Sequence, residues 1–96
     1  MLFNEAQEIL KEHKKDLSKL GVRSLAIFGS TAKNEGKRNS DVDILVDFDS
    51  KKGLFIFLDL KDYLEDLLHS PVDLVTKKSL HPALKKRILS EAKQIF

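Results

Sequence analysis

Several classes of protein are excluded by what this 96-residue sequence lacks. It contains no cysteine, so it forms neither a disulfide nor a thiolate metal site, which fits a reducing compartment. No apolar run approaches the roughly 20 residues that span a membrane, and residues 1–17 carry too many charges for a signal peptide. We therefore expect a cytoplasmic protein that does not enter a membrane.

An excess of charge of one sign is also missing. Lysine and arginine number 17, aspartate and glutamate 15, and the net charge is +2. This balance gives no sign of nucleic-acid binding through bulk charge. The 42% of hydrophobic and 33% of charged residues are typical of a folded protein. We expect one small domain over residues 1–96, and domains of this size often depend on a partner chain or a ligand.

The spacing of apolar residues predicts an alternation of helices and strands. Strands are predicted over residues 22–28, 41–48 and 72–75. Helices are predicted over residues 4–20 and 54–69 and from Ser79 to the C-terminus, with a helical turn and loop over 31–39. This order predicts an α+β fold in which a small mixed β-sheet is packed with helices.

The end of the first predicted strand carries Gly29 and Ser30. Glycine lets a phosphate group approach the backbone closely, and serine offers a hydroxyl and an amide. If a helical turn begins here, its free N–H groups point to the same place. This half of the predicted site can hold phosphate oxygens.

Two aspartates begin the second predicted strand. Asp41 and Asp43 are two residues apart, so their side chains share one face, with Cα atoms roughly 6.5–7 Å apart. Carboxylates that converge in this way repel each other, and a divalent cation removes the repulsion. Mg²⁺ takes hard oxygen ligands and keeps phosphates in its shell, and Mn²⁺ suits the same ligands. The pattern predicts a metal–triphosphate site.

A third carboxylate, Asp73, interrupts the apolar strand over residues 72–75. If this strand lies beside the second one, Asp73 reaches the same centre. It could then complete the metal site or accept the proton of an attacking hydroxyl.

The motif Gly29-Ser30, followed after residues 31–40 by Asp41-x-Asp43, resembles the signature of the DNA polymerase beta-type nucleotidyltransferase superfamily. The likeness covers most of the chain and is carried by residues 27–32, 40–46, 71–76 and 84–92. It is similar above all to the shortest members, the minimal nucleotidyltransferases usually found beside a HEPN-domain protein.

The resemblance implies a role for each of these residues. Asp41 and Asp43 would bind metal, Asp73 would complete the catalytic set, and Gly29 and Ser30 would contact phosphates. It further implies a Mg²⁺-dependent enzyme that uses ATP. Family members of this length are typically antitoxins that bind a HEPN ribonuclease toxin and transfer AMP to one of its tyrosines.

The sequence departs from the family pattern after the Gly-Ser pair. The usual Gly-Ser-x-Ala-Arg-Gly has Lys33 and Asn34 in its last two positions here. Lysine keeps the charge but loses the bidentate fork of arginine, so Lys33 is a candidate phosphate ligand and equally a solvated loop residue. Asparagine is the non-glycine residue that best tolerates a left-handed backbone.

Two other functions stay open at this point. The chain could neutralise a toxin by contact alone, with a catalytically weak site. It could also transfer a nucleotide to a small molecule, as in aminoglycoside modification. Enzymes of that kind carry a second domain for the acceptor, which 96 residues leave no room for, so a partner or an oligomer would have to supply it.

The segment over residues 54–58 is apolar on all sides for more than one helical turn. A surface helix buries only one stripe, so this segment exceeds what a monomer needs. Our hypothesis is that part of it, together with Ile95 and Phe96, meets a partner chain.

Overall fold

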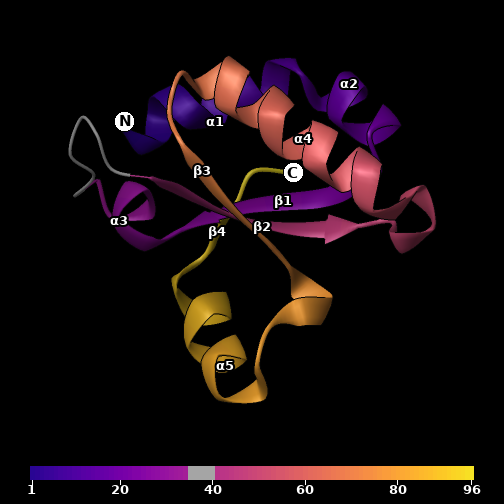
Figure 1. Cartoon of the computed structure of the whole chain (residues 1–96). Coiled ribbons are helices and arrows are strands. Elements are labelled where there is room, and N and C mark those ends of the chain that lie inside the picture. The colour runs from indigo at the N-terminus through magenta and orange to yellow at the C-terminus, as the bar shows by residue number, and fades with distance from the viewer. Residues whose placement is uncertain (35–40) are drawn as a thin grey trace.

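A computed structural model describes residues 1–34 and 41–96 and places a four-stranded sheet at the centre of the molecule (Figure 1). In chain order the elements are α1 (Phe3–Glu12), α2 (Lys14–Lys19), β1 (Val22–Phe28), α3 (Gly29–Ala32), β2 (Val42–Phe48), the 3₁₀-helix η1 (Ser50–Lys52), α4 (Gly53–Leu68), β3 (Val72–Thr76), the 3₁₀-helix η2 (Lys77–Ser79), α5 (Pro82–Glu91) and β4 (Lys93–Gln94). The predicted α+β class with a small mixed sheet is confirmed. The later part of the predicted loop, residues 35–39, lies outside the described residues, as does residue 40.

The strands are ordered β3-β2-β1-β4 across the sheet. β1 runs antiparallel to β2 and to β4, whereas β2 and β3 are parallel and joined by the crossover helix α4. Two consequences follow for the site. The starts of β2 and β3 lie side by side, and the end of β1 meets them there because it runs the opposite way.

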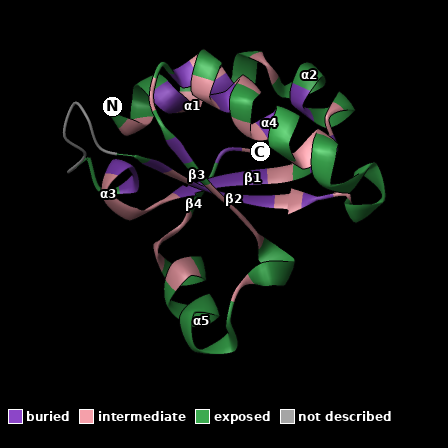
Figure 2. Cartoon of the chain, in the orientation of Figure 1, coloured by how far each residue is buried: buried purple, intermediate pink, exposed green. Residues whose placement is uncertain are grey.

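Helices α1, α2 and α4 cover one face of the sheet, and α5 lies on the other (Figure 1). The main core forms under the first three, where leucines of the helices meet Ile27, Ile44 and Val46 of β1 and β2. Figure 2 shows that the buried residues lie mainly between the sheet and helices α1, α2 and α4, while α5 has no buried residue. The second face of the sheet is therefore only thinly covered.

The predicted helix over residues 4–20 is two helices that meet at His13. The backbone N–H of His13 donates to the carbonyl of Leu10, three residues back, and its ring Nδ1 lies 2.7 Å from the carbonyl oxygen of Ile9. The turn tightens at this point and α2 begins in a new direction. Within the described residues, no helix combines the length and the apolar character needed to cross a bilayer.

The prediction that the last helix runs to the C-terminus is wrong. Helix α5 ends at Glu91, and β4 then pairs with β1 through Ala26↔Gln94 and Ile27↔Lys93. The pairing satisfies backbone groups that β1 would otherwise leave open at its edge. Ile95 follows the strand into the core, where it is 5% exposed, and Phe96 packs against that core. The hypothesis that Ile95 meets a partner is therefore wrong, whereas the partly buried Phe96 leaves its own part of the hypothesis a prediction.

Candidate active site

The end of β1 and the starts of β2 and β3 bring three of the sequence-predicted residues together. Asp43 pairs with Phe28 of β1 on one side and with Asp73 of β3 on the other. Gly29 directly follows Phe28, so it lies beside Asp43. Since neighbouring strands are about 4.8 Å apart, the two carboxyl groups face each other across the strand pair.

Gly29 is in close contact with the side chain of Asp43. A Cβ atom added at Gly29 would overlap the carboxylate oxygen Oδ2 of Asp43. The backbone φ of Gly29 is +70°, in the left-handed region that L side chains rarely adopt. Both the space and the backbone conformation therefore require glycine where the chain turns from β1 into α3.

The electrostatics of the site centre on Asp43. Burial raises the pKa of this carboxyl, and the negative charges of Asp73 and then Asp41 raise it further. A hydrogen bond between the side chains of Asp43 and Asp73 contributes to the same rise in pKa. The pair is thus a place where negative charge is costly and a proton or a cation is favoured.

Asp41 lies just before β2, is exposed, and acts on Asp43 through its charge. Within residues 1–34 and 41–96, no three His, Cys, Asp or Glu side chains are gathered closely enough to enclose a metal ion. The chemistry of the donors nevertheless fits one. Asp43 and Asp73 offer facing hard oxygens, Asp41 adds a third carboxylate nearby, and a divalent cation would relieve their repulsion.

Two hydrogen bonds fix the starts of β2 and β3. The Val42 N–H donates to the carbonyl of Pro71 at 2.9 Å, and the Val72 N–H donates to Oε2 of Glu65 at 2.9 Å. Glu65 belongs to α4 and so ties the edge strand that carries Asp73 to the helix layer. Sequence reasoning missed Glu65, because its partner is a backbone group that no side-chain pattern reveals.

Lys33 is not brought to the aspartates. Its Nζ lies 3.7 Å from Oε1 of Glu91 in α5, and Nε of Arg87 lies 3.6 Å from the same oxygen. Glu91 therefore links the loop after α3 to α5, a contact that the sequence did not indicate. Asn34 has the expected left-handed backbone, with a φ of 57°, and its Oδ1 accepts a hydrogen bond from the Phe3 N–H.

Comparison with known proteins relates this geometry to a family. A family model for the nucleotidyltransferase domain matches residues 10–95. The chain is 46% identical over 92 residues to the protein adenylyltransferase MntA of Thermococcus cleftensis, a match that covers 95% of this chain and 93% of the relative.

Two solved structures are similar over nearly the whole chain. One is named as a candidate minimal nucleotidyltransferase, with a TM-score of 0.85, 31% identity, and coverage of 97% of this chain and 95% of that chain. The other is a toxin–antitoxin with AMP-PNP, with a TM-score of 0.71, 25% identity, and coverage of 100% of this chain and 73% of that chain.

Proposed function

The chain belongs to the nucleotidyltransferase domain family, and from this premise we propose that it transfers AMP from ATP to a tyrosine hydroxyl of a HEPN toxin and acts as the antitoxin. The name of the relative MntA, a protein adenylyltransferase, supports the transfer to a protein. The similar toxin–antitoxin structure with AMP-PNP supports a toxin as the partner and an adenine nucleotide as the substrate. The observation that carries the proposal is the register that sets Asp43 between Gly29 and Asp73.

Gly29 and Ser30 would receive the triphosphate. The left-handed glycine leaves no side chain between the backbone and a phosphate oxygen, and Ser30 adds a hydroxyl and an N–H. Asp41, Asp43 and Asp73 would hold Mg²⁺, or Mn²⁺ in its place. When bound, the cation supplies positive charge that neutralises the triphosphate and the three carboxylates.

The acceptor hydroxyl would lie on the open side of the site. Asp73 is exposed on β3, whereas Asp43 is half-buried, so a protein substrate can reach Asp73 more readily than Asp43. Asp73 would accept the proton of the hydroxyl as its oxygen bonds to the α-phosphorus. The bond from the α-phosphorus to the bridging oxygen breaks, and pyrophosphate leaves. The protein contributes chiefly by positioning the reactants and by stabilising charge.

The test is labelling with α-³²P-ATP and Mg²⁺ in lysate of the source organism. The chain is added as wild type, as the Asp41→Asn/Asp43→Asn double variant, or as Asp47→Asn. Asp47 lies on β2 four residues after Asp43 and is a matched control for removing one carboxylate from the same strand. We expect a labelled protein band with wild type and Asp47→Asn, with the label on a tyrosine.

Two outcomes would contradict the proposal. A band of equal strength with the double variant would show that the aspartates do not carry the transfer. Label in no protein band, but in a small product, would indicate a small-molecule acceptor.

Contact-only neutralisation is the second candidate, and the exposed apolar side chains at the start of α4 favour it. Leu54, Phe55 and Leu58 are 68%, 82% and 46% exposed, which suits a protein interface. If contact alone suffices, the double variant will still protect cells from the toxin. If transfer is required, cells that carry the double variant will stop growing.

A further inference from the structure

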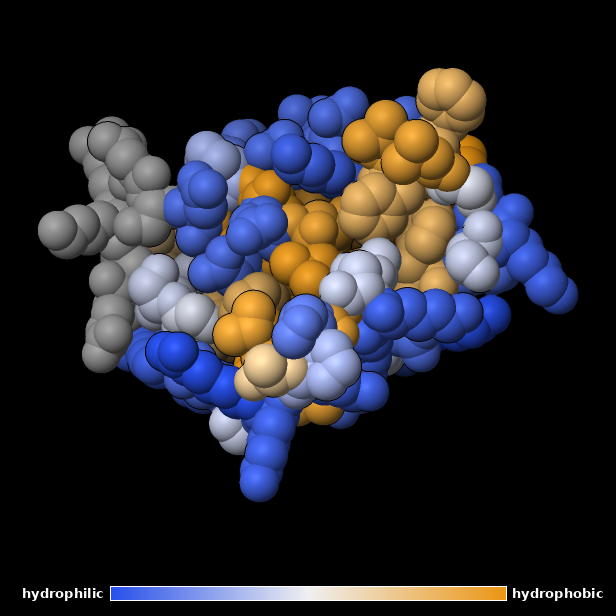
Figure 3. Space-filling view, turned by 60° about the horizontal axis from the view of Figure 1, so that its bottom comes forward, coloured by the Kyte–Doolittle hydropathy of each residue, from blue (hydrophilic) through white to orange (hydrophobic). Residues whose placement is uncertain are grey.

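The start of α4 carries three of the six large hydrophobic side chains that are exposed among the described residues. Leu54, Phe55 and Leu58 project from its first turns. Beside them a pocket of about 430 Å³ opens between α4 and the end of β3. We call this surface, the three side chains together with the pocket, the α4 patch. In Figure 3 an apolar region crosses the visible face and reaches one end of the molecule, with hydrophilic side chains on both sides.

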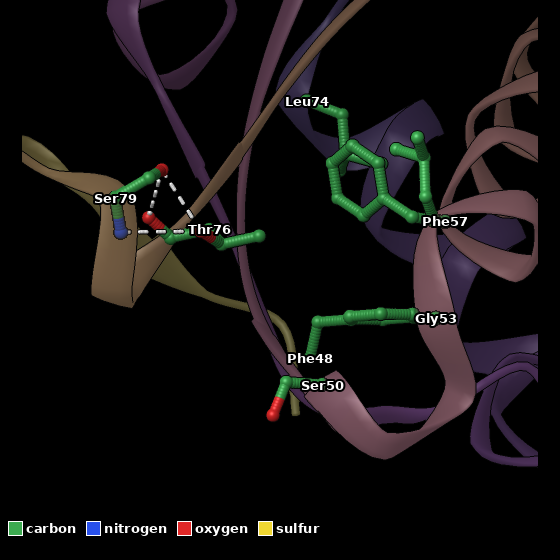
Figure 4. Close-up of a pocket in the computed structure, with 8 residues that line it drawn as sticks. Phe48, Ser50, Gly53, Phe57, Leu74, Thr76 and Ser79 are labelled. Atoms are coloured by element: carbon green, nitrogen blue, oxygen red, sulfur yellow. Dashed lines mark hydrogen bonds between the residues drawn. The ribbon is translucent and has the colours of Figure 1, made fainter.

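The pocket has an apolar floor and a polar rim. Phe48, Phe57 and Leu74 form the floor, and the rings of Phe48 and Phe57 meet edge to face with centroids 5.4 Å apart. Figure 4 shows Thr76 and Ser79 on the opposite side of the opening, hydrogen-bonded to each other. An apolar side chain in the pocket would therefore leave the hydroxyls of Thr76 and Ser79 hydrogen-bonded.

The α4 patch is separate from the candidate active site. The patch lies at the ends of β2 and β3, whereas Asp43 and Asp73 stand near the starts of the same two strands. The five residue steps from Asp43 to Phe48 span roughly 16 Å at about 3.3 Å per residue. Leu74, the lining residue that follows Asp73, points to the opposite face of the sheet from Asp73. A molecule bound at the patch would leave the aspartates free.

Lysines are chain neighbours of the pocket's lining residues on both sides. Lys51 and Lys52 lie in η1, between the lining residues Ser50 and Gly53, and Lys78 lies in η2, between the lining residues Thr76 and Ser79; all three lysines are exposed. Lys77 lines a second pocket with Leu45 and Leu89 and is not part of this surface. In the described part of the chain, none of these three lysines has a carboxylate oxygen within 4.0 Å.

The nearby carboxylate of Asp49 is already engaged. It lies 3.6 Å from Nη2 of Arg23 and accepts the backbone N–H of Lys51. The strip of apolar surface thus has Lys51 and Lys52 on one side and Lys78 on the other, and the described residues pair no carboxylate with them.

We propose that the α4 patch docks an acidic amphipathic helix of a partner protein. Such a helix presents apolar side chains along one stripe and carboxylates along both flanks, which matches an apolar strip with lysines on both sides. A small ligand could fill the pocket, but Phe55 and Leu58 lie outside its lining and would stay exposed. A second copy of this chain would bring lysines against lysines across a two-fold axis. The inference stands whether or not the chain transfers AMP, because the patch contains no residue of the candidate active site.

The test is selection from a displayed library of 20-residue helical peptides. One face of each peptide varies among apolar residues, and the other face varies among Asp, Glu, Lys, Arg and Ser. The full chain is the target, and Leu54→Ser/Phe55→Ser is the negative target. Leu84→Ser/Leu89→Ser, which removes two exposed leucines of α5, is the matched control. All four side chains are at least 44% exposed, so the variants should fold, and their melting temperatures check this.

We expect the selection to enrich peptides with an acidic polar face. An enriched peptide should bind wild type and the α5 variant equally and bind Leu54→Ser/Phe55→Ser at least tenfold more weakly. Lys51→Ser/Lys78→Ser should weaken binding severalfold and reduce its dependence on salt.

Three results would overturn the proposal. One is the absence of enrichment over the negative target, and another is enrichment of neutral or basic peptides. The third is a dimer of this chain in solution that Leu54→Ser/Phe55→Ser dissociates, which would assign the patch to a second copy.

Discussion

At the scale of single residues, Gly29 is the position in the candidate site where the structure most strictly requires glycine. Its φ of +70° and its contact with Oδ2 of Asp43 both exclude a side chain. We expect Gly29→Ala to lower the free energy of unfolding by about 1–3 kcal/mol, since a left-handed backbone is strained for alanine. We also expect it to weaken Mg·ATP binding at least tenfold, because the new Cβ displaces the Asp43 carboxylate. Chemical denaturation and calorimetric titration measure the two effects.

Gly53 provides the control for backbone strain. Its φ is +86°, but a Cβ added there would meet no atom within 4 Å. Gly53→Ala should therefore destabilise the fold to a similar extent and leave Mg·ATP binding unchanged. If both variants lost ATP binding equally, general destabilisation would explain the loss, and the contact with Asp43 would not matter.

Asp43 should lower the free energy of unfolding of the metal-free protein. It faces Asp73 directly, and like charges opposite each other on neighbouring strands are destabilising. We expect Asp43→Asn to raise the free energy of unfolding by about 0.2–1 kcal/mol at pH 7 without divalent metal. Thermal unfolding in chelator measures it, with Asp47→Asn as the matched control. A loss of stability in Asp43→Asn would contradict this account of the pair.

The effect of Asp43 on the free energy of unfolding should depend on pH. Burial and the charges of Asp73 and Asp41 raise the pKa of Asp43 above its ordinary 3.8, so the unfolded chain releases this proton first as the pH rises. Stability therefore falls between the ordinary and the raised pKa and stays lower above it. We expect the advantage of Asp43→Asn over wild type to be full at pH 7 and to shrink as the pH approaches 3.8. An advantage that grows on acidification would contradict the assignment.

The sequence could place these residues because their positions follow from local rules. Alternation along a strand puts Asp41 and Asp43 on one face, and the apolar neighbours of Asp73 mark a strand. Glu65 and Glu91 could not be found in this way. Glu65 binds a backbone N–H seven residues away, and Glu91 meets Lys33 across the fold, so both contacts depend on tertiary structure.

At the scale of elements, the C-terminal segment contributes more to the core than α5 does. Ile95 is 5% exposed and donates its N–H to the Leu25 carbonyl at 2.8 Å, whereas Leu84 of α5 is 51% exposed. We expect Ile95→Ala to cost about 2–4 kcal/mol of unfolding free energy. Leu84→Ala should change it by less than about 0.5 kcal/mol. Chemical denaturation of both variants checks the pair, and equal effects would contradict the packing of the C-terminus.

How well the sequence predicted the boundaries of an element depended on how far apart in sequence the interacting residues are. Strands β1, β2 and β3 and helix α4 were predictable because each has a clear apolar period. The end of α5 was not predictable, because β4 forms by pairing with the edge of β1, which lies about 70 residues earlier in the chain. The break at His13 escaped prediction because the apolar spacing continues through it.

At the scale of the whole molecule, the parallel pair β2 and β3 separates the candidate active site from the α4 patch. The carboxylates lie near the start of the pair and the α4 patch at its end. If both proposals hold, the chain binds a partner at one place and modifies it at another.

This separation should show in paired binding measurements. We expect Leu54→Ser/Phe55→Ser to keep the Mg·ATP affinity of wild type, and Asp41→Asn/Asp43→Asn to keep the affinity for a selected acidic helix, because distant sites contribute independently. Calorimetric titration of both ligands into both variants measures it. Loss of both ligands in either variant would show that the two surfaces are coupled.

The most direct test of the central claim, that the three aspartates and the Gly-Ser turn form a metal–nucleotide site, is titration of ATP into the purified chain with Mg²⁺. We expect wild type and Asp47→Asn to bind ATP with equal affinity. Both should lose ATP binding when a chelator removes Mg²⁺. Asp41→Asn/Asp43→Asn should bind at least tenfold more weakly. ATP binding of wild-type strength in the double variant would contradict the assignment of the site.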